Sequence, residues 1–141
     1  FYPHPKKGVR CLCFCGKIER EISELENEEK ELFLKEYGLK EFSATKYIRT
    51  SYNLLNLISF FTIGKDEVKA WTIPKGTNAY EAAGFIHTDI QKGFIKAEVI
   101  PWEQLVSAGS LKDAKEKGLV RLEGKDYLIQ DGDVIYFRFS K

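Results

Sequence analysis

The part of the chain from Leu57 onward alternates short apolar segments with turn residues. Residues 58–63 and 68–73 are rich in β-branched and aromatic side chains, which is typical of strands. The residues between them, Gly-Lys-Asp-Glu at 64–67, have the composition of a turn. The pattern therefore predicts a β-hairpin at the start of this part.

A helix and further strands are predicted after the hairpin. Residues 74–77 break the second strand, and Asn78 is placed to cap a helix over 79–86, whose small residues 82–84 allow a close approach to a sheet. The rest of the pattern predicts a strand over 94–100, helical turns over 102–108 and 111–117, and strands over 120–122, 127–129 and 134–139, with hairpin turns at 124–125 and 131–132. This order predicts an α+β fold of the β-grasp, or ubiquitin-like, type.

The first part of the chain has a different texture. Residues 9–14 form a short apolar segment that predicts a strand, and Gly16 turns the chain out of it. Charged amphipathic segments follow, with Asn27 and Ser43 as expected helix caps. A strand followed by long helices predicts the end of a larger α/β domain whose earlier strands are missing.

The composition is that of a soluble globular chain, with 43% hydrophobic and 30% charged residues. The net charge is +1, so any binding to nucleic acid or membranes must come from a local patch. No apolar run of about 18 residues is present, which argues against a membrane-spanning helix. The chain of 141 residues contains no methionine and starts at Phe1, so we expect a piece of a longer protein.

Three cysteines follow one another at every second position, Cys11, Cys13 and Cys15. On a strand such residues share a face, and neighbouring thiols so spaced are poorly placed to form a disulfide. The spacing also differs from the C-x-x-C of zinc sites. We expect one face of a buried strand in a reducing cytosol, with metal or redox chemistry as the alternative.

The sequence contains no complete set of catalytic motifs. A phosphate-binding P-loop needs G-x-x-x-x-G-K-[ST], and the Gly-Lys pairs at 16–17 and at 124–125 lack the remaining residues. His87 and Asp89 are too few for a closed metal site. We expect His87 to cap the end of a helix and Asp89 to hold the turn, with a binding-surface role or catalysis as alternatives.

A local basic and aromatic surface is the candidate for nucleic-acid binding. From Thr62 onward the numbers of basic and acidic residues are equal, so only their placement on a sheet can produce such a patch. Ordinary solubilising lysines are the alternative. The candidate surface consists of Lys69, Trp71, Lys75, Lys92, Lys96 and Arg138.

Several segments together resemble one known family. They are Phe60-Phe61-Thr62, Ala70-Trp71-Thr72-Ile73, residues 82–89 (AAGFIHTD), residues 93–99 (GFIKAEV), residues 123–127 (EGKDY) and residues 131–134 (DGDV). This combination is similar to the C-terminal region of the YchF/Obg-like ATPases. The resemblance implies that residues 57–141 are a TGS domain, a β-grasp module shared with threonyl-tRNA synthetases and RelA/SpoT enzymes.

The first part fits the same family. Cys15, Gly16 and Lys17 resemble its last nucleotide-base recognition loop, which usually reads Ser-Ala-Lys. The base contact in that loop is made largely by backbone N–H groups, which Gly16 still supplies. The resemblance implies that residues 1–56 are the C-terminal remnant of a P-loop G domain, with its last strand and helices.

The family resemblance implies a cytoplasmic, ribosome-associated P-loop ATPase or GTPase as the parent protein. ATP or GTP and Mg²⁺ are implied for that parent, and no cofactor and no metal is expected in this piece. We expect ribosome or RNA contact and regulation of the upstream G domain, with no membrane partner and no hydrolysis by this chain alone. The alternative is a ubiquitin-like protein-interaction module that does not bind nucleic acid.

Overall fold

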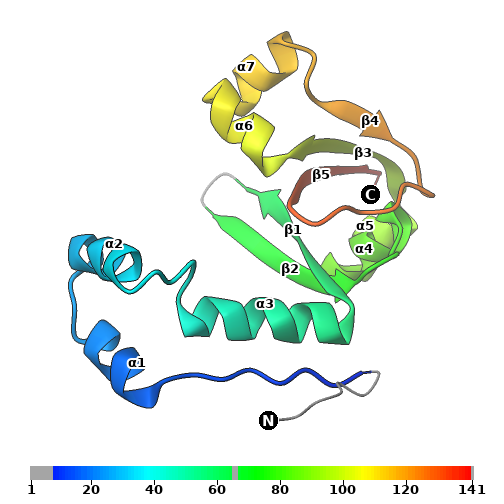
Figure 1. Ribbon diagram of the computed structural model, residues 1–141. Helices are drawn as coiled ribbons and strands as arrows, with labels where there is room; N and C mark the ends of the chain where they lie inside the picture. Colours follow the sequence, from blue (N-terminus) through cyan, green and yellow to red (C-terminus); the bar gives the residue numbers. More distant parts are fainter. Residues whose placement is uncertain (1–7, 65–66, 141) are drawn as a thin grey trace. The chain divides into compact units, whose positions relative to one another are not determined.

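The computed structural model describes residues 8–64 and 67–140 (Figure 1). The chain forms two compact units, Phe1–Leu55 and Asn56–Lys141. The first unit is helical, and the second combines helices with a mixed five-stranded sheet. The predicted α+β class is therefore confirmed.

The described part of the first unit contains three helices, α1 (Gly16–Ser23), α2 (Asn27–Glu36) and α3 (Ser43–Leu55). The cap of α2 is Glu26, one residue before the predicted cap, because the Glu29 carboxylate accepts the backbone N–H of Glu26 at 3.1 Å. The hydroxyl of Ser43, which we expected to cap α3, donates to the Glu19 carboxylate of α1.

The strand predicted over residues 9–14 is absent. Residues 9–15 form neither strand nor helix, and Cys11, Cys13 and Cys15 are exposed. A strand exists only beside another strand that accepts and donates its backbone hydrogen bonds. No strand of the described sheet pairs with this segment, so the prediction of a buried strand with cysteines on one face is wrong for this chain.

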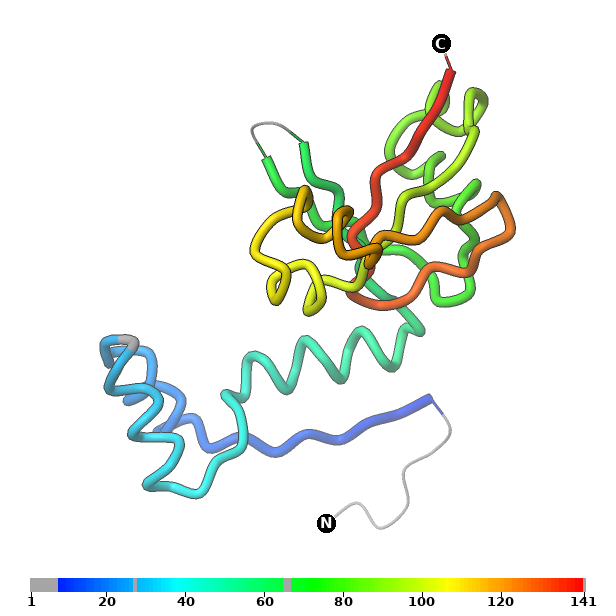
Figure 2. Tube along the Cα trace, turned by 90° about the horizontal axis from the view of Figure 1, so that it is seen from above, coloured from blue at the N-terminus to red at the C-terminus, as the bar shows by residue number. Residues whose placement is uncertain are grey.

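The sheet of the second unit is built around its last strand. The hairpin of β1 (Leu57–Ile63) and β2 (Val68–Pro74) is confirmed, although residues 65–66 of its predicted turn lie outside the described ranges. β5 (Asp133–Phe139) pairs in parallel with β1 and antiparallel with β3 (Phe94–Pro101), and β4 (Arg121–Glu123) adds to β3. The order is β2-β1-β5-β3-β4, and Figure 2 shows β5, in red, running through the middle of the unit.

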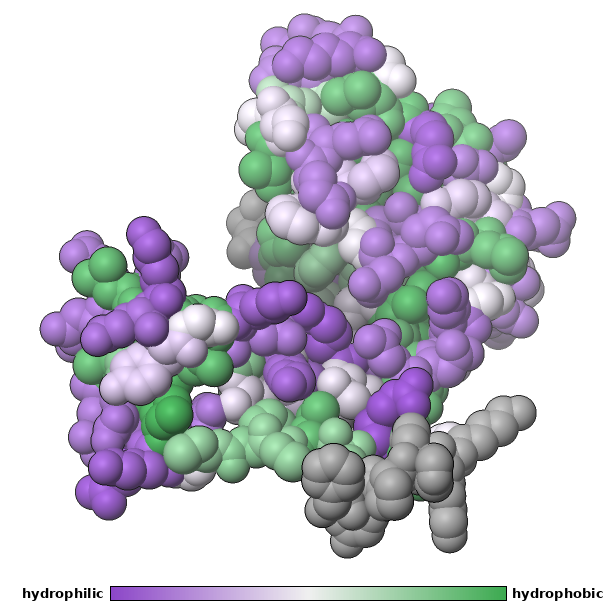
Figure 3. Space-filling view, in the orientation of Figure 1, coloured by the Kyte–Doolittle hydropathy of each residue, from purple (hydrophilic) through white to green (hydrophobic). Residues whose placement is uncertain are grey.

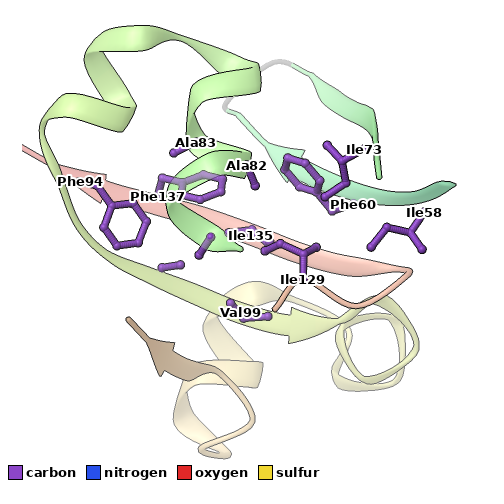
Figure 4. Packing of buried hydrophobic residues seen from close by; sticks show 12 residues of the cluster. Ile58, Phe60, Ile73, Ala82, Ala83, Phe94, Val99, Ile129, Ile135 and Phe137 are labelled. Carbon is purple, nitrogen blue, oxygen red and sulfur yellow. The ribbon is translucent and has the colours of Figure 1, made fainter. Parts of the chain in front are cut away.

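Helix α4 (Ala79–Ile86) begins at the predicted cap. The Asn78 side chain accepts the N–H of Glu81 at 2.9 Å, and the Glu81 carboxylate accepts the N–H of Asn78 at 3.2 Å. Ala82 and Ala83 are fully buried against the sheet, as their size predicts. Figure 4 shows both alanines directed toward the aromatic and aliphatic side chains of the strands. The core therefore lies between α4 and one side of the sheet.

The sheet has two faces because successive side chains on a strand point to opposite sides. We call the side packed against α4 the α4 face; its buried strand residues include Ile58, Phe60, Ile73, Ala97, Val99, Ile135 and Phe137. We call the opposite side the α7 face; it carries Lys96, Glu98, Ile100, Val134, Tyr136 and Arg138. Helices α6 (Trp102–Ala108) and α7 (Leu111–Glu116) cover one end of the α7 face, where Ala114 packs with Ile100 and Val134.

The last third of the chain departs from the predicted hairpins. β4 pairs with β3 only, and residues 127–129 form no strand beyond one bridge between Asn78 and Leu128. The carbonyl of Tyr127 accepts the N–H of Ala79 at 2.8 Å, so this segment pairs with the start of α4. Gly132 then donates its N–H to the Ser59 carbonyl at 2.8 Å, which directs the chain into β5 beside β1.

Candidate functional site

The six residues of the predicted basic and aromatic surface do not lie together. Lys69 and Trp71 of β2 stand opposite Thr62 and Phe60, which places them on the α4 face. Lys96 and Arg138 stand opposite each other on the α7 face. The sheet therefore separates these four candidates into two pairs on opposite sides.

The pair on the α4 face is tied into the fold. The indole N–H of Trp71 donates to the hydroxyl of Thr62 at 2.9 Å, and the ring packs against the core. The ammonium group of Lys69 lies 4.1 Å from the centre of that ring, a distance at which a cation is attracted to the aromatic face. Trp71 is therefore an anchor of the β2 edge, and Lys69 is the exposed member of the pair.

The α7 face holds a nearly buried carboxylate between two cations. The side chain of Glu98 is 6% exposed, and its Oε2 lies 2.7 Å from the ammonium group of Lys115 on α7. Its Oε1 accepts from Nε of Arg138 at 2.6 Å and also from Nη2 of that residue. The pKa of Glu98 is lowered, chiefly by the hydrogen bond from Lys115 and further by Arg138. Burial acts in the opposite direction and raises this pKa, but the two cations outweigh it.

Sequence reasoning missed Glu98, Lys115 and Tyr136. Glu98 is the charged residue in an otherwise apolar strand segment, Ala97 to Ile100, and that isolated charge was the available signal. The pairing with Lys115 depends on where α7 docks, which no local pattern specifies. Tyr136 lies opposite Glu98 on β5 and is 57% exposed.

Two further lysines of the candidate surface lie at element ends. Lys75 follows β2 in the turn, where its N–H donates to the Asn56 carbonyl at 2.8 Å. Lys92 ends helix α5 (Thr88–Lys92) and borders a surface pocket of about 770 Å³. The other residues lining the pocket are His87, Asp89, Ile90, Gly93, Phe139 and Ser140. Neither lysine is part of the row formed by Lys96 and Arg138.

His87 joins two helices. It follows α4, and its Nδ1 accepts the backbone N–H of Asp89 at 3.1 Å, which caps α5. The carboxylate of Asp89 lies 3.6 Å from the same nitrogen. At the end of α4, where we expected the cap, it is the backbone N–H of His87 that donates to the carbonyl of Ala83, whereas its side chain caps the start of α5, a short helix in place of the expected loop. In the part of the chain that the structure describes, no three metal-ligating side chains are grouped.

The three residues that resemble a nucleotide-base loop begin α1. The carbonyl of Cys15 accepts the N–H of Glu19 at 3.0 Å, and Gly16 is the first helical residue. The side chain of Lys17 is 86% exposed and lies 4.0 Å from the Glu21 carboxylate. A helix start presents backbone N–H groups, which suits contact with acceptor atoms of a ligand. Their role in base recognition stays a prediction.

A second buried polar group supports the loop that leads to β5. The hydroxyl of Tyr127 donates to Oδ2 of Asp133 at 2.8 Å, and the N–H of Gln130 donates to the same oxygen at 2.9 Å. Arg121 donates to the Tyr127 oxygen at 3.0 Å. Burial, followed by the hydrogen bond to Asp133, raises the pKa of Tyr127 to about 12. These contacts hold the loop and offer no reactive group.

The chain thus combines a helical first unit with a second unit of mixed α and β structure, and comparisons with known proteins identify its family. A family model named YchF-GTPase_C, described as a protein of unknown function (DUF933), matches residues 57–140. The chain therefore belongs to the YchF-GTPase_C family.

Individual relatives agree with this assignment. The chain is 54% identical over 134 residues to the ribosome-binding ATPase YchF of Bacillus subtilis and 53% identical over 136 residues to the protein of that name from Mycoplasma genitalium. These matches cover 95% and 96% of this chain and 37% of each relative. The Obg-like ATPase 1 of Gallus gallus is 43% identical over 133 residues, with 94% and 33% covered. The chain thus corresponds to the C-terminal part of longer homologues.

A solved structure shows the same fold. The YchF GTPase of Schizosaccharomyces pombe superposes with a TM-score of 0.71 at 36% sequence identity, over 84% of this chain and 31% of that chain. Within the described residues, no helix combines the length and the apolar character that crossing a membrane requires.

Proposed function

We propose that this chain is the C-terminal portion of a YchF-type ATPase or GTPase and supplies its contact with ribosomes or RNA. The observation that carries the proposal is the identity of 54% to a relative named a ribosome-binding ATPase. ATP or GTP and Mg²⁺ belong to the longer parent, because the sequence given contains no P-loop. The chain alone is expected to hydrolyse no nucleotide, and the parent to work in the cytosol with ribosomes.

The first unit is proposed to complete the nucleotide-binding G domain. Ile22 is its one buried hydrophobic side chain among the described residues, whereas Leu32 is 69%, Tyr47 60% and Leu55 65% exposed. Apolar helix faces of this kind are normally packed against another layer of a domain. This exposure supports packing against upstream parts of the parent, with Cys15, Gly16 and Lys17 as the base-contacting loop.

The second unit is proposed to be a TGS domain of the β-grasp type. A hairpin, a helix across it and a last strand inserted beside the first support this proposal, since that is the order expected for the fold. The module would both contact the ribosome and regulate the G domain. Its surface cations are the groups suited to RNA phosphates.

The test is salt-dependent cosedimentation of the 141-residue chain with purified ribosomes. Contact with RNA phosphates releases counterions. The logarithm of the binding constant is therefore expected to fall linearly with the logarithm of the salt concentration. Absence of binding at low salt would contradict the proposal. Binding that is insensitive to salt would favour the alternative, a ubiquitin-like protein-interaction module.

A further inference from the structure

The outer part of the α7 face combines an exposed aromatic ring with cations. Lys96 of β3 pairs with Arg138 of β5, and Tyr136 lies two residues before Arg138 on the same side. Tyr136 is 57% exposed, and the side chains of Arg138 and Lys115 are 53% and 48% exposed. Residues two apart on a strand are separated by about 6.6 Å, and the guanidinium group of Arg138 reaches Glu98, which stands opposite Tyr136.

Glu98 holds two of these cations in place. It is nearly buried, and its two oxygens engage Arg138 and Lys115 from opposite elements, β5 and α7. One carboxylate shared by two cations leaves an excess of positive charge, and the exposed Lys96 adds to it. Two acidic groups of α7 have partners on that helix or at its cap, since Asp113 accepts from the Ser110 hydroxyl at 2.7 Å and Glu116 lies 3.9 Å from Lys112.

Figure 3 shows hydrophilic side chains gathered over α7. On the α4 face, α4 covers the sheet, and Trp71 is hydrogen-bonded to Thr62 and packed against the core, so its ring is not free to stack with a base. A flat sheet surface with an exposed ring among fixed cations suits an unpaired base, which stacks on the ring while its phosphates meet the cations. Leu122 of β4, opposite Glu98 and 57% exposed, adds one apolar side chain to this face, whereas a protein interface usually has a larger apolar centre that is depleted of charge.

We propose that the α7 face binds an unpaired RNA segment, with a base stacked on Tyr136 and phosphates at Lys96, Arg138 and Lys115. This inference rests on the proposed function and specifies which face carries it. It also divides the surface expected from the sequence, because Lys69 and Trp71 belong to the opposite face.

The experiment measures binding of the full chain to a labelled oligouridine of roughly ten nucleotides, a length within the site sizes of single-strand binders. Tyr136→Thr keeps a residue that favours strands but removes the ring, and it is expected to weaken binding roughly 5- to 100-fold. Tyr136→Phe keeps the ring and is expected to bind with the affinity of the unsubstituted chain. Lys96→Gln is expected to lower the salt slope by about 0.7.

Matched controls lie away from the α7 face. Phe85→Ala removes an aromatic side chain of α4 that is 51% exposed, and Lys69→Gln removes a cation of the α4 face. Both are expected to leave the affinity unchanged. The thermal unfolding midpoint of each variant is measured so that a loss of binding is compared only between folded proteins.

The outcomes separate this inference from the proposed function. If the unsubstituted chain binds ribosomes, but Tyr136→Thr and Lys96→Gln bind RNA as tightly as the unsubstituted chain, the inference is overturned and the proposed function stands. Equal losses of oligouridine affinity in Tyr136→Phe and Tyr136→Thr would also overturn the inference, because stacking needs the ring and not the hydroxyl. If the unchanged chain binds neither ribosomes nor oligouridine, the proposed function itself fails.

Discussion

Arg138 of β5 and Glu98 of β3 are joined across the α7 face, where Nε of Arg138 donates to Oε1 of Glu98 at 2.6 Å. The two residues are not direct cross-strand partners, since Arg138 stands opposite Lys96 and Glu98 stands opposite Tyr136. The diagonal contact, completed by Lys115 from α7, links the central strands to the helix that covers one end of that face. Both the stability of the module and its proposed RNA surface depend on this contact.

Replacing Glu98 by Gln is expected to destabilise the second unit by about 1–3 kcal/mol at neutral pH. The neutral amide at this nearly buried position removes the anionic partner of Arg138 and Lys115, whose side chains are about half exposed. Unfolding in urea is followed by tryptophan fluorescence, since both tryptophans, Trp71 and Trp102, lie in this unit. Glu116→Gln on the exposed side of α7 is the control, with a change within about 0.5 kcal/mol.

The same contact predicts a dependence on acid. A carboxyl group whose pKa is lower in the folded chain contributes stability above its unfolded value, and this contribution is lost as the pH falls through the folded pKa. For Glu98 the loss is expected below the ordinary value of 4.5. The free energy of unfolding of the unsubstituted chain should therefore fall more steeply in that pH range than that of Glu98→Gln. Parallel curves of unfolding free energy against pH for the two proteins would contradict the assignment.

Tyr127→Phe is expected to cost about 1–2 kcal/mol below pH 10, because the buried carboxylate of Asp133 loses a donor. The pKa of Tyr127 is raised to about 12, so its neutral form favours the folded state. This stabilisation is present below about pH 10 and is lost as the pH rises toward 12. The tyrosinate absorbance of the unsubstituted chain should contain one titration near pH 12 that is missing from Tyr127→Phe.

Gly132→Ala is expected to destabilise the turn before β5 by about 1–3 kcal/mol. Gly132 has φ +84, and an added Cβ would lie 2.6 Å from Cδ1 of Trp102. Gly124→Ala is the matched control, since nothing lies within 4 Å of an added Cβ there and its φ is not positive. The thermal unfolding midpoints of the two variants are compared with that of the unsubstituted chain. An equal decrease in both would show that the contact with Trp102 does not cause the destabilisation.

Charge reversal of Lys92 and Lys96 together is expected to weaken ribosome binding and to reduce its salt slope. Lys96 lies on the α7 face, whereas Lys92 ends α5 beside the surface pocket. We therefore expect Lys96→Glu alone to account for most of the loss. The measurement is affinity against salt for the two single variants and the double variant. Unchanged affinity and slope in the double variant would remove these lysines from the contact.

The predictions that were confirmed depend on local signals. The hairpin of β1 and β2 follows from two β-branched segments around a turn, and the start of α4 follows from Asn78 and Glu81, three residues apart. Both arise between residues that are close in sequence, so the chain pattern contains all the required information.

The predictions that were wrong concern strands that need a distant partner. Residues 9–14 and 127–129 have apolar character, but neither gains a neighbouring strand in the described sheet. Strand formation depends on backbone hydrogen bonds to another segment, and composition does not supply that segment. In the same way, the sequence grouped Lys69 and Arg138 into one candidate surface, whereas the pairing of the strands places them on opposite faces of the sheet.

By itself, the sequence determined the α+β class, the hairpin, the capped helix α4 and the resemblance to a family that the comparisons then showed. The tertiary structure decided which side of the sheet is covered, because α4 buries one face and α7 docks at one end of the other. That docking brings Lys115 to Glu98, residues far apart in sequence whose contact exists only after the sheet and helix have packed together.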